Sequence, residues 1–141
     1  MSDVPRKLDP QVTGNVGLYY TCYHLSLLGW NVMPTVRNAR GVDAIAYSRD
    51  ARTFRSIQIK ALSKRNPVPL GKSLDKIMGD FWVIVNKVVT EPEVFILKPC
   101  EVHELAEQKG TGDKLAYWLQ PKHYDCDKFR GAWNRIGRGD D

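Results

Sequence analysis

The sequence has few cysteines, no long apolar run and no internal repeat. Its three cysteines, Cys22, Cys100 and Cys126, cannot all pair with one another, and the residues after Met1 lack the pattern of a secretion or transit signal. These observations favour a reduced, cytoplasmic protein. The apolar segments stop well before the roughly 20 residues that a membrane-spanning helix needs, so no such helix is expected. The absence of a repeat argues against a solenoid.

Several catalytic motifs are also missing. The sequence contains no glycine-rich phosphate-binding loop and no Rossmann fingerprint. Cys22 and His24 are two positions apart on an expected helix and face different directions, so they cannot act together as nucleophile and base. Positive charge is in excess, with 21 Lys and Arg against 16 Asp and Glu and a formal net charge of +5. This excess favours a polyanionic partner such as nucleic acid.

Length and composition predict one globular domain. The chain has 141 residues, of which 43% are hydrophobic and 26% charged, which is enough to form a real core. We expect a loose N-terminal arm at residues 1–10 and a core at 11–98. An extension at 99–136 is expected to pack on the same domain, followed by a tail at 137–141.

The most informative stretch is 41–62, which has the pattern of a β-hairpin with a polar turn at 48–52. Side chains alternate between the two faces of a strand. Apolar residues occupy one face of both strands, namely Val42, Ala44, Ala46, Ile57, Ile59 and Ala61. The opposite face then carries Asp43, Gln58 and Lys60. The usual hairpin register brings these three side chains together.

Other elements are expected on both sides of this hairpin. Apolar periodicity and turn residues predict helices at 14–28, 100–108 and 125–136, a short helix near 74–78, and strands at 31–36, 81–89, 94–97 and 115–119. Thr13 is the expected N-cap of the first helix, whose tyrosines fit a core position better than a base-stacking surface. Pro34 favours an edge position for its strand. The apolar run at 81–89 favours an interior strand.

An Asp on one strand followed by Gln-x-Lys on the next resembles the PD-(D/E)XK nuclease superfamily in its Gln-x-Lys variant. Small restriction-endonuclease-like and Holliday-junction-resolvase-like proteins share this pattern. The helix that starts near Gly14 and ends in Gly29-Trp30-Asn31-Val32 extends the resemblance, which covers residues 12–97. It implies an α/β fold with a restriction-endonuclease-like α-β-β-β-α-β core, in which helices flank a mixed central sheet.

The resemblance also implies a function. It implies an endonuclease that uses Mg²⁺ or Mn²⁺ to hydrolyse phosphodiester bonds in DNA, and several members act as homodimers. Asp43 would be the main metal ligand, with further oxygens from the Ile59 backbone carbonyl and the Gln58 side chain. Lys60 would orient the attacking water and stabilise the transition state. Mg²⁺ is often held by only one or two carboxylates together with waters and substrate phosphates.

One position departs from the family pattern. Active members carry a Glu on the first helix, at a position that Gly17 or Leu18 matches here, and the helix expected at 14–28 contains no acidic residue. Asp80, just before the strand expected at 81–89, is a candidate substitute. The departure keeps open a nucleic-acid-binding module without catalysis.

A third interpretation is a protein-interaction role. In this case Trp30, Trp118 or Trp133 would lie at an interface.

Basic residues before and after the hairpin are candidate contacts with the nucleic-acid backbone. They are Arg37, Arg40, Lys64, Arg65 and Lys72. Lys and Arg near a scissile phosphate typically contact the backbone and not the bases. For Arg37 and Arg40, a solvated polar loop is an equally good explanation.

A zinc site was considered from two pairs of residues. Cys100-x-x-His103 and His123-x-x-Cys126 have the pair spacing of zinc ligands. Their inverted order favours the alternative, in which the first pair belongs to a helix and the second to an unrelated loop. No zinc site is therefore expected.

Overall fold

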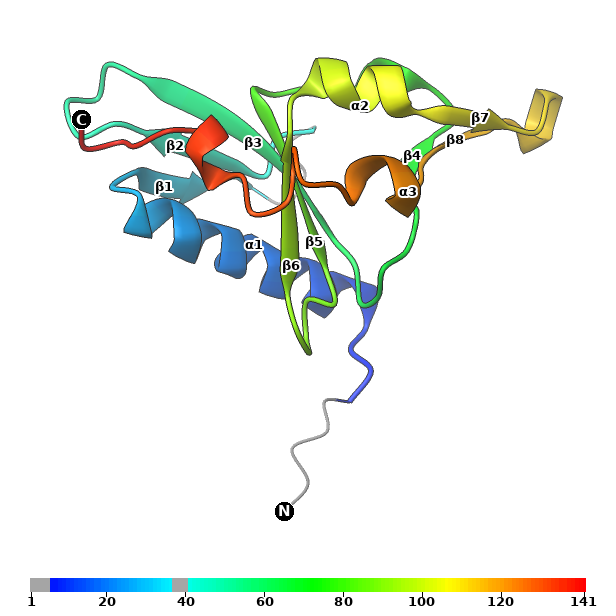
Figure 1. The fold of residues 1–141 in the computed structure, drawn as a ribbon, viewed down its shortest axis with the longest axis horizontal. Coiled ribbons are helices and arrows are strands. Elements are labelled where there is room, and N and C mark those ends of the chain that lie inside the picture. Colours follow the sequence, from blue (N-terminus) through cyan, green and yellow to red (C-terminus); the bar gives the residue numbers. More distant parts are fainter. Residues whose placement is uncertain (1–5, 37–40) are drawn as a thin grey trace.

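The computed structural model describes residues 6–36 and 41–141 (Figure 1). Its helices and strands follow one another as α1 (Pro10–Leu27), β1 (Asn31–Pro34), β2 (Ala44–Tyr47), β3 (Phe54–Ala61), β4 (Val68–Gly71), β5 (Phe81–Asn86), β6 (Glu93–Leu97), α2 (Pro99–Leu105), β7 (Glu107–Lys109), β8 (Ala116–Leu119) and α3 (Pro121–Tyr124). Single 3-10 turns lie at Leu74–Lys76, Gly112–Lys114 and Trp133–Arg135. None of the helices in these two ranges is long and apolar enough to cross a membrane.

A five-stranded mixed sheet forms the centre of the molecule. Its order is β1-β2-β3-β5-β6, in which β3 and β5 run parallel and the other neighbours run antiparallel. A separate sheet of three short strands has the order β4-β8-β7 and projects to one side (Figure 1). The expected mixed sheet flanked by helices is therefore confirmed. The expected edge strand at Pro34 is confirmed too, because β1 is the first strand of the sheet.

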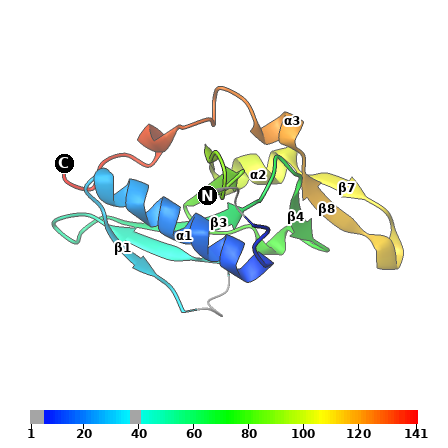
Figure 2. The ribbon, with the colours of Figure 1, turned by 90° about the horizontal axis from the view of Figure 1, so that it is seen from below.

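Two hydrophobic cores lie on the two faces of the central sheet. One core contains Leu25 of α1 together with Phe81, Val83 and Val85 of β5. The other contains Trp82 and Ile84 of β5 together with residues of α2, α3, β4, β6 and β8. Figure 2 shows α1 crossing one face, with α2 and α3 placed away from it. Because side chains alternate along a strand, β5 contributes to both cores and all six of its residues are buried.

Helix α1 packs unusually close to the sheet because its buried stripe consists mainly of small residues. Thr13, Gly17, Thr21 and Leu25 are buried at intervals of four residues. A Cβ atom added at Gly17 would lie 2.4 Å from the Cβ atom of Ala61 in β3. Glycine at this position thus permits the close approach of helix and strand.

Two expectations for α1 were wrong. The helix starts at Pro10 and not near Gly14, because Asp9 is the N-cap and its Oδ1 accepts a hydrogen bond of 3.0 Å from the Val12 amide. Tyr19 and Tyr23, expected in the core, are 64% and 61% exposed. The small residues of the stripe take the positions that face the sheet.

The helix expected at 125–136 was also wrong. The backbone here pairs with the open edge of β6: the Ile96 amide donates to the Phe129 carbonyl and the Gly131 amide donates to the Val94 carbonyl. Gly131 has a φ of +58°, which does not fit a right-handed helix. Phe129 and Ile136 are nevertheless buried, as the apolar pattern indicated.

The connection from β3 to β5 differs in detail from the expectation. A 3-10 turn at Leu74–Lys76 takes the place of the short helix near 74–78, and β4 precedes it. Strand β4 pairs with β8 and not with the central sheet. This connection therefore bridges the two sheets and encloses space beside β3.

Candidate active site

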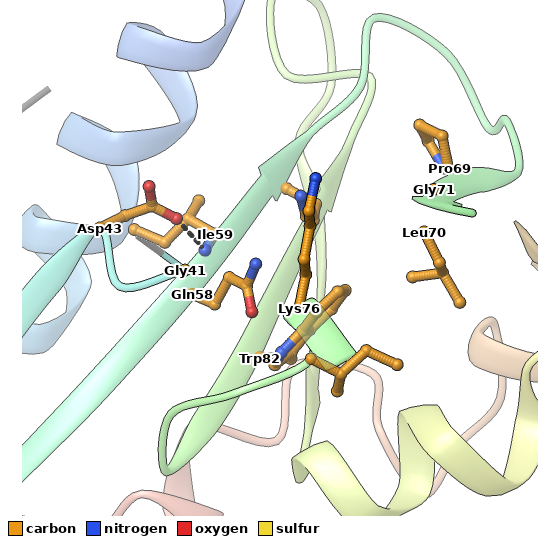
Figure 3. A pocket seen from close by; sticks show the side chains of 11 residues that line it. Gly41, Asp43, Gln58, Ile59, Pro69, Leu70, Gly71, Lys76 and Trp82 are labelled. Atoms are coloured by element: carbon orange, nitrogen blue, oxygen red, sulfur yellow. Dashed lines mark hydrogen bonds between the residues drawn. The ribbon is translucent and has the colours of Figure 1, made fainter. Parts of the chain in front are cut away.

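Asp43 is fixed against β3 at the start of β2. Ala44 lies opposite Ile57 in the antiparallel pair, so the preceding residue, Asp43, lies beside Gln58. The Asp43 amide donates to the Ile57 carbonyl at 2.8 Å, and Asp43 Oδ2 accepts from the Ile59 amide at 2.7 Å. Figure 3 shows this second bond as a dashed line. The hairpin thus holds the carboxylate in one position before any ligand binds.

The predicted site residues line one pocket with a volume of about 380 Å³. Gln58, Ile59 and Lys60 belong to β3, Asp43 lies just before β2, and residues 69–71 of β4 line the opposite wall. Figure 3 shows Asp43, Gln58 and Ile59 on one side and Pro69, Leu70 and Gly71 on the other. Lys76, Ile77 and Trp82 complete the lining. The structure therefore brings the carboxylate, the amide and the ammonium together.

The Gln58 side chain is held by a hydrogen bond to the backbone of Met78. The Gln58 side chain is 6% exposed, and its Oε1 accepts a long hydrogen bond of 3.4 Å from the Met78 amide. Trp82 Nε1 donates to the Met78 carbonyl at 3.2 Å. The two side chains thus anchor the chain after the 3-10 turn to the strands below it.

Lys60 is partly buried beside Trp82 and within electrostatic range of Asp43. Its Nζ is 5.5 Å from the centroid of the Trp82 ring, within range of a cation–π contact. Burial lowers the pKa of Lys60, the nearby Asp43 carboxylate raises it in part, and the positive charge of Lys76 lowers it further. The net effect is a pKa below the usual lysine value.

Lys76 and Trp82 were not predicted as site residues. In the parallel register Gln58 lies beside Trp82, and Lys76 belongs to the 3-10 turn that follows β4. The alternating pattern of β5 could have placed Trp82 on the Gln58 face had the pairing of β3 with β5 been known. The sequence carries no signal for that register or for the course of the connection that places Lys76.

A second hollow of about 370 Å³ shares Asp43 and Ile59 with the first. Helix α1 contributes Asn15, Leu18 and other residues to its lining. Of the two positions that match the family's helix acid, Leu18 lines this hollow and Gly17 packs against Ala61. Helix α1 therefore presents no carboxylate to Asp43, and the exposed Asn15 brings an amide there instead.

The donor atoms around Asp43 fit a hard divalent cation. Within a β-strand the N–H and C=O of one residue leave the backbone on the same side, so we expect the Ile59 carbonyl on the same edge of β3 as its amide, which donates to Asp43. Together with Gln58, these groups offer oxygen donors of the kind that Mg²⁺ prefers. No three acidic, His or Cys side chains gather to hold a metal within residues 6–36 and 41–141. Asp43 would thus be the main protein ligand.

Asp80, the candidate substitute for the helix acid, bonds to β3 outside the pocket. Its Oδ2 accepts from the Ser56 amide at 2.8 Å and from Ser56 Oγ at 3.2 Å. Ser56 lies on β3 four residues before Lys60, and Asp80 is not among the residues that line the pocket. Its carboxylate thus ties the start of β5 to β3.

Of the predicted nucleic-acid contacts, Lys64, Arg65 and Lys72 do not line this pocket. Arg37 and Arg40 fall outside the described residues. Lys64 and Lys72 are exposed, and Arg65 Nε bonds to Asp125 Oδ2 at 2.7 Å. Arg65 is thus engaged in an ion pair with the segment after α3.

The two pairs with zinc-ligand spacing lie on different helices or next to them. Cys100 and His103 are on α2, and Cys100 is an exposed free thiol. His123 is on α3, where its Nε2 lies 3.0 Å from Glu107 Oε1, and Cys126 follows that helix.

The tryptophans considered for an interface differ in exposure. Trp30 is 5% exposed, and its Nε1 donates to the Gly137 carbonyl at 2.9 Å, so it belongs to the core. Trp133 stacks on His24 with ring centroids 5.0 Å apart. Trp118 is partly buried in β8.

Comparison with known proteins shows a likeness in structure but none in sequence. No family model matches the sequence, and no curated protein sequence matches it. The chain is similar to the structure of a bacterial homing endonuclease, I-Ssp6803I, with a TM-score of 0.63 and 12% sequence identity. The match covers 92% of this chain and 93% of that chain. It shows a shared nuclease-like fold over nearly the whole length.

Proposed function

We propose that this chain is an endonuclease of the PD-(D/E)XK type that hydrolyses phosphodiester bonds in DNA with Mg²⁺ or Mn²⁺. The observation that carries the proposal is the pocket in which Asp43, Gln58 and Lys60 meet beside the Ile59 backbone. The likeness to a homing endonuclease supports a nuclease, and the net charge of +5 supports a polyanionic substrate.

Each group has a distinct part in this chemistry. Hydrolysis needs a water in line with the leaving oxygen and positive charge around the phosphate, and a divalent ion held by Asp43, the Ile59 carbonyl and Gln58 supplies both when bound. Asp43 is already oriented by the Ile59 amide, so its ligand oxygens need no further ordering. Lys60 lines the same pocket and can donate hydrogen bonds to the attacking water and to a phosphate oxygen.

The environment of Lys60 suits this part. Burial lowers its pKa, so its ammonium gives up a proton more readily than an exposed lysine would. Poor hydration also strengthens its interaction with an anionic phosphate that enters the pocket. Lys76, on the same lining, adds a second positive charge next to the phosphate.

A nicking assay tests the proposal. Supercoiled plasmid and a branched duplex are incubated with Mg²⁺ or Mn²⁺ and with wild type, Asp43→Asn or Lys60→Met. Asn keeps an acceptor for the Ile59 amide, and Met keeps most of the Lys60 volume while it removes a poorly hydrated charge, so both variants are expected to fold. We expect cleavage to fall by at least about 100-fold in each. Lys114→Met, an exposed lysine outside the pocket, is the control and should cut like wild type.

Metal-dependent cleavage that survives in both site variants would refute the site. A single copy has one active site and is expected to cut one strand, whereas a double-strand break requires two copies of the chain. The mass of the protein–DNA complex is therefore measured in parallel to count the copies bound. A homodimer is the expected form.

A second function is favoured by one specific observation. Helix α1 offers only Gly17 and Leu18 where active family members carry an acid, so the scaffold is also suited to binding nucleic acid without cutting it. Salt-sensitive DNA binding without nicking, under every metal condition, would single out this function. Negligible DNA binding at physiological salt would leave a protein partner instead.

A further inference from the structure

A third hollow, larger than the two at Asp43, lies where the N-terminal arm meets the loops at one end of the sheet. Its volume is about 540 Å³. Arg6 and Lys7 precede α1, and Lys64 belongs to the connection between β3 and β4. It shares no lining residue with either hollow beside Asp43. We refer to it as the basic hollow.

The lining of the basic hollow is suited to an anion. Besides the three cations, Thr13, Ser63 and Thr90 line it, and no carboxylate does. The Thr90 hydroxyl donates to the Lys87 carbonyl at 3.4 Å, which leaves Thr13 and Ser63 as the hydroxyl residues considered for an anion. The acidic residue next to it on the arm, Asp9, already accepts a hydrogen bond from the Val12 amide as the N-cap of α1. Cations and hydroxyls without a counter-charge are a donor set for phosphate oxygens.

The three cations have no acidic partner inside the described part of the chain. The ion pairs among the described residues all involve other side chains, so no carboxylate in this part of the chain neutralises Arg6, Lys7 or Lys64. By contrast Arg65, next in sequence to Lys64, is bound to Asp125. Of these two adjacent residues, Lys64 can therefore bind an anion without breaking an ion pair, whereas Arg65 cannot.

The loop that carries Lys64 is fixed to the sheet on both sides. The Leu62 amide donates to the Val85 carbonyl, and the Val88 amide donates to the Leu62 carbonyl. Beyond Lys64, the Tyr124 hydroxyl donates to the Asn66 carbonyl at 2.6 Å. The positions of Ser63 and Lys64 are therefore set by β5 and α3, and this wall of the basic hollow does not need to be ordered by a ligand.

The basic hollow lies close to the candidate active site along the chain. Ser63 is three residues beyond Lys60, so their Cα atoms are at most about 11 Å apart. Successive nucleotides of one DNA strand advance about 3.4 Å along the helix axis. A strand whose scissile phosphate lies at Lys60 would thus have another phosphate near Ser63 within about three nucleotides.

We propose that the basic hollow binds a phosphate of the DNA backbone within about three nucleotides of the scissile phosphate. This inference rests on the proposed nuclease function, because the scissile phosphate is placed by Asp43 and Lys60. The contact is independent of sequence and positions the duplex, because a backbone phosphate carries no base information.

The experiment measures how DNA binding depends on salt. Fluorescence anisotropy with a labelled duplex, in EDTA so that nothing is cut, compares wild type with Lys7→Gln, Lys64→Gln and the double variant from about 50 to 200 mM salt. The slope of log K against log salt should become shallower by about 1 for each lysine removed and by about 2 for the double variant. Lys114→Gln, on the loop between β7 and β8, is the matched control and should keep the wild-type slope.

Three outcomes overturn the inference. Slopes in the Lys7 and Lys64 variants that equal those of wild type and of the control exclude a phosphate contact. Binding of millimolar inorganic phosphate that is lost in the double variant, while inorganic phosphate at constant ionic strength leaves the affinity for DNA unchanged, indicates a site for free phosphate instead. A loss that depends on the base sequence of the duplex also contradicts a backbone contact.

The failure of this inference can be told apart from the failure of the proposed function. A wild type that binds DNA with the expected slopes but cuts nothing refutes catalysis and leaves the backbone contact standing. A wild type that cuts, with unchanged slopes in the variants, refutes the backbone contact alone. Where cleavage occurs, the double variant should raise KM by at least about tenfold at 0.1 M salt and leave kcat unchanged, because it keeps Asp43 and Lys60.

Discussion

The two glycines of helix α1 allow the packing of this helix to be tested with a built-in comparison. A Cβ atom at Gly17 would lie 2.4 Å from the Ala61 Cβ, whereas a Cβ atom at Gly14 would have no atom within 4 Å. Carbon atoms in contact prefer separations of about 3.5 to 4.0 Å, so Gly17→Ala is more than about 1 Å too close. Ala61 Cβ is attached directly to the strand backbone and cannot rotate away. The helix and β3 must therefore separate.

The expected magnitudes have opposite signs at the two positions. Alanine is favoured over glycine inside a helix by about 0.5 to 1 kcal/mol, and Gly14→Ala should gain this amount. Overpacking at Gly17 costs about 1 to 3 kcal/mol, so that Gly17→Ala should lose a net of about 1 to 2 kcal/mol. For a chain of this length about 1 kcal/mol corresponds to a change of about 3 °C in Tm. The two variants should therefore melt roughly 5 to 9 °C apart.

Thermal and urea unfolding of both variants measure this difference. A Gly17→Ala protein that melts at or above the wild-type temperature would refute the close packing of α1 on β3. The double variant Gly17→Ala, Ala61→Gly removes the clash and should recover about 1 to 2 kcal/mol relative to the sum of the single changes. Additive effects would show that the loss arises elsewhere.

Two further predictions concern carboxylates. Asn15→Glu places a carboxylate in the hollow beside Asp43, so we expect cleavage at a severalfold lower Mg²⁺ concentration. Its fold should be less stable in EDTA, because the two carboxylates repel each other, and should recover when Mg²⁺ is added. Asn15→Gln, which has the same length as Glu and no charge, should change neither property, and equal effects of Glu and Gln would contradict the metal assignment. Burial raises the pKa of Glu101, but hydrogen bonds from Arg135, from the Lys98 amide and from Lys128 outweigh it and lower the pKa to about 2. Because the pKa of Glu101 is depressed in the folded state, its stabilisation is present above about pH 5 and is lost as the pH falls towards 2. In urea unfolding, Glu101→Gln should be less stable than wild type by about 2 to 3 kcal/mol at neutral pH, and this difference should vanish near pH 2. A difference that does not depend on pH would refute the role of the charge.

The β2–β3 hairpin could be predicted from the sequence alone. Alternation alone places Asp43 and Gln58 on one face, and the short turn fixes their register because the two strands are close in sequence. The β5–β6 hairpin and the extended segment at β8 were predictable for the same local reasons. Local patterns thus gave the centre of the sheet and the position of three site residues.

Features that depend on long-range contacts could not be predicted. Apolar residues at 129 and 136 fit a helix as well as the observed segment, and only the open edge of β6 decides between them. The helical spacing of Tyr19 fits a core position, but the side of α1 that faces the sheet carries mainly small residues, and only the packing of helix on sheet decides between the two faces. Lys76 reaches the pocket through a connection whose course depends on the pairing of β4 with β8.

The pairing of the C-terminal segment with β6 has a consequence for the order of events during protein synthesis. The five strands of the central sheet are complete once Leu97 has been made, but the outer edge of β6 gains its partner only with Gly131, 34 residues later. At roughly 5 to 20 residues per second this leaves the edge unpaired for about 2 to 7 s. An open strand edge is a site for pairing with another chain. A nascent chain is therefore most prone to aggregate in this interval, and truncation before Phe129 would make that condition permanent.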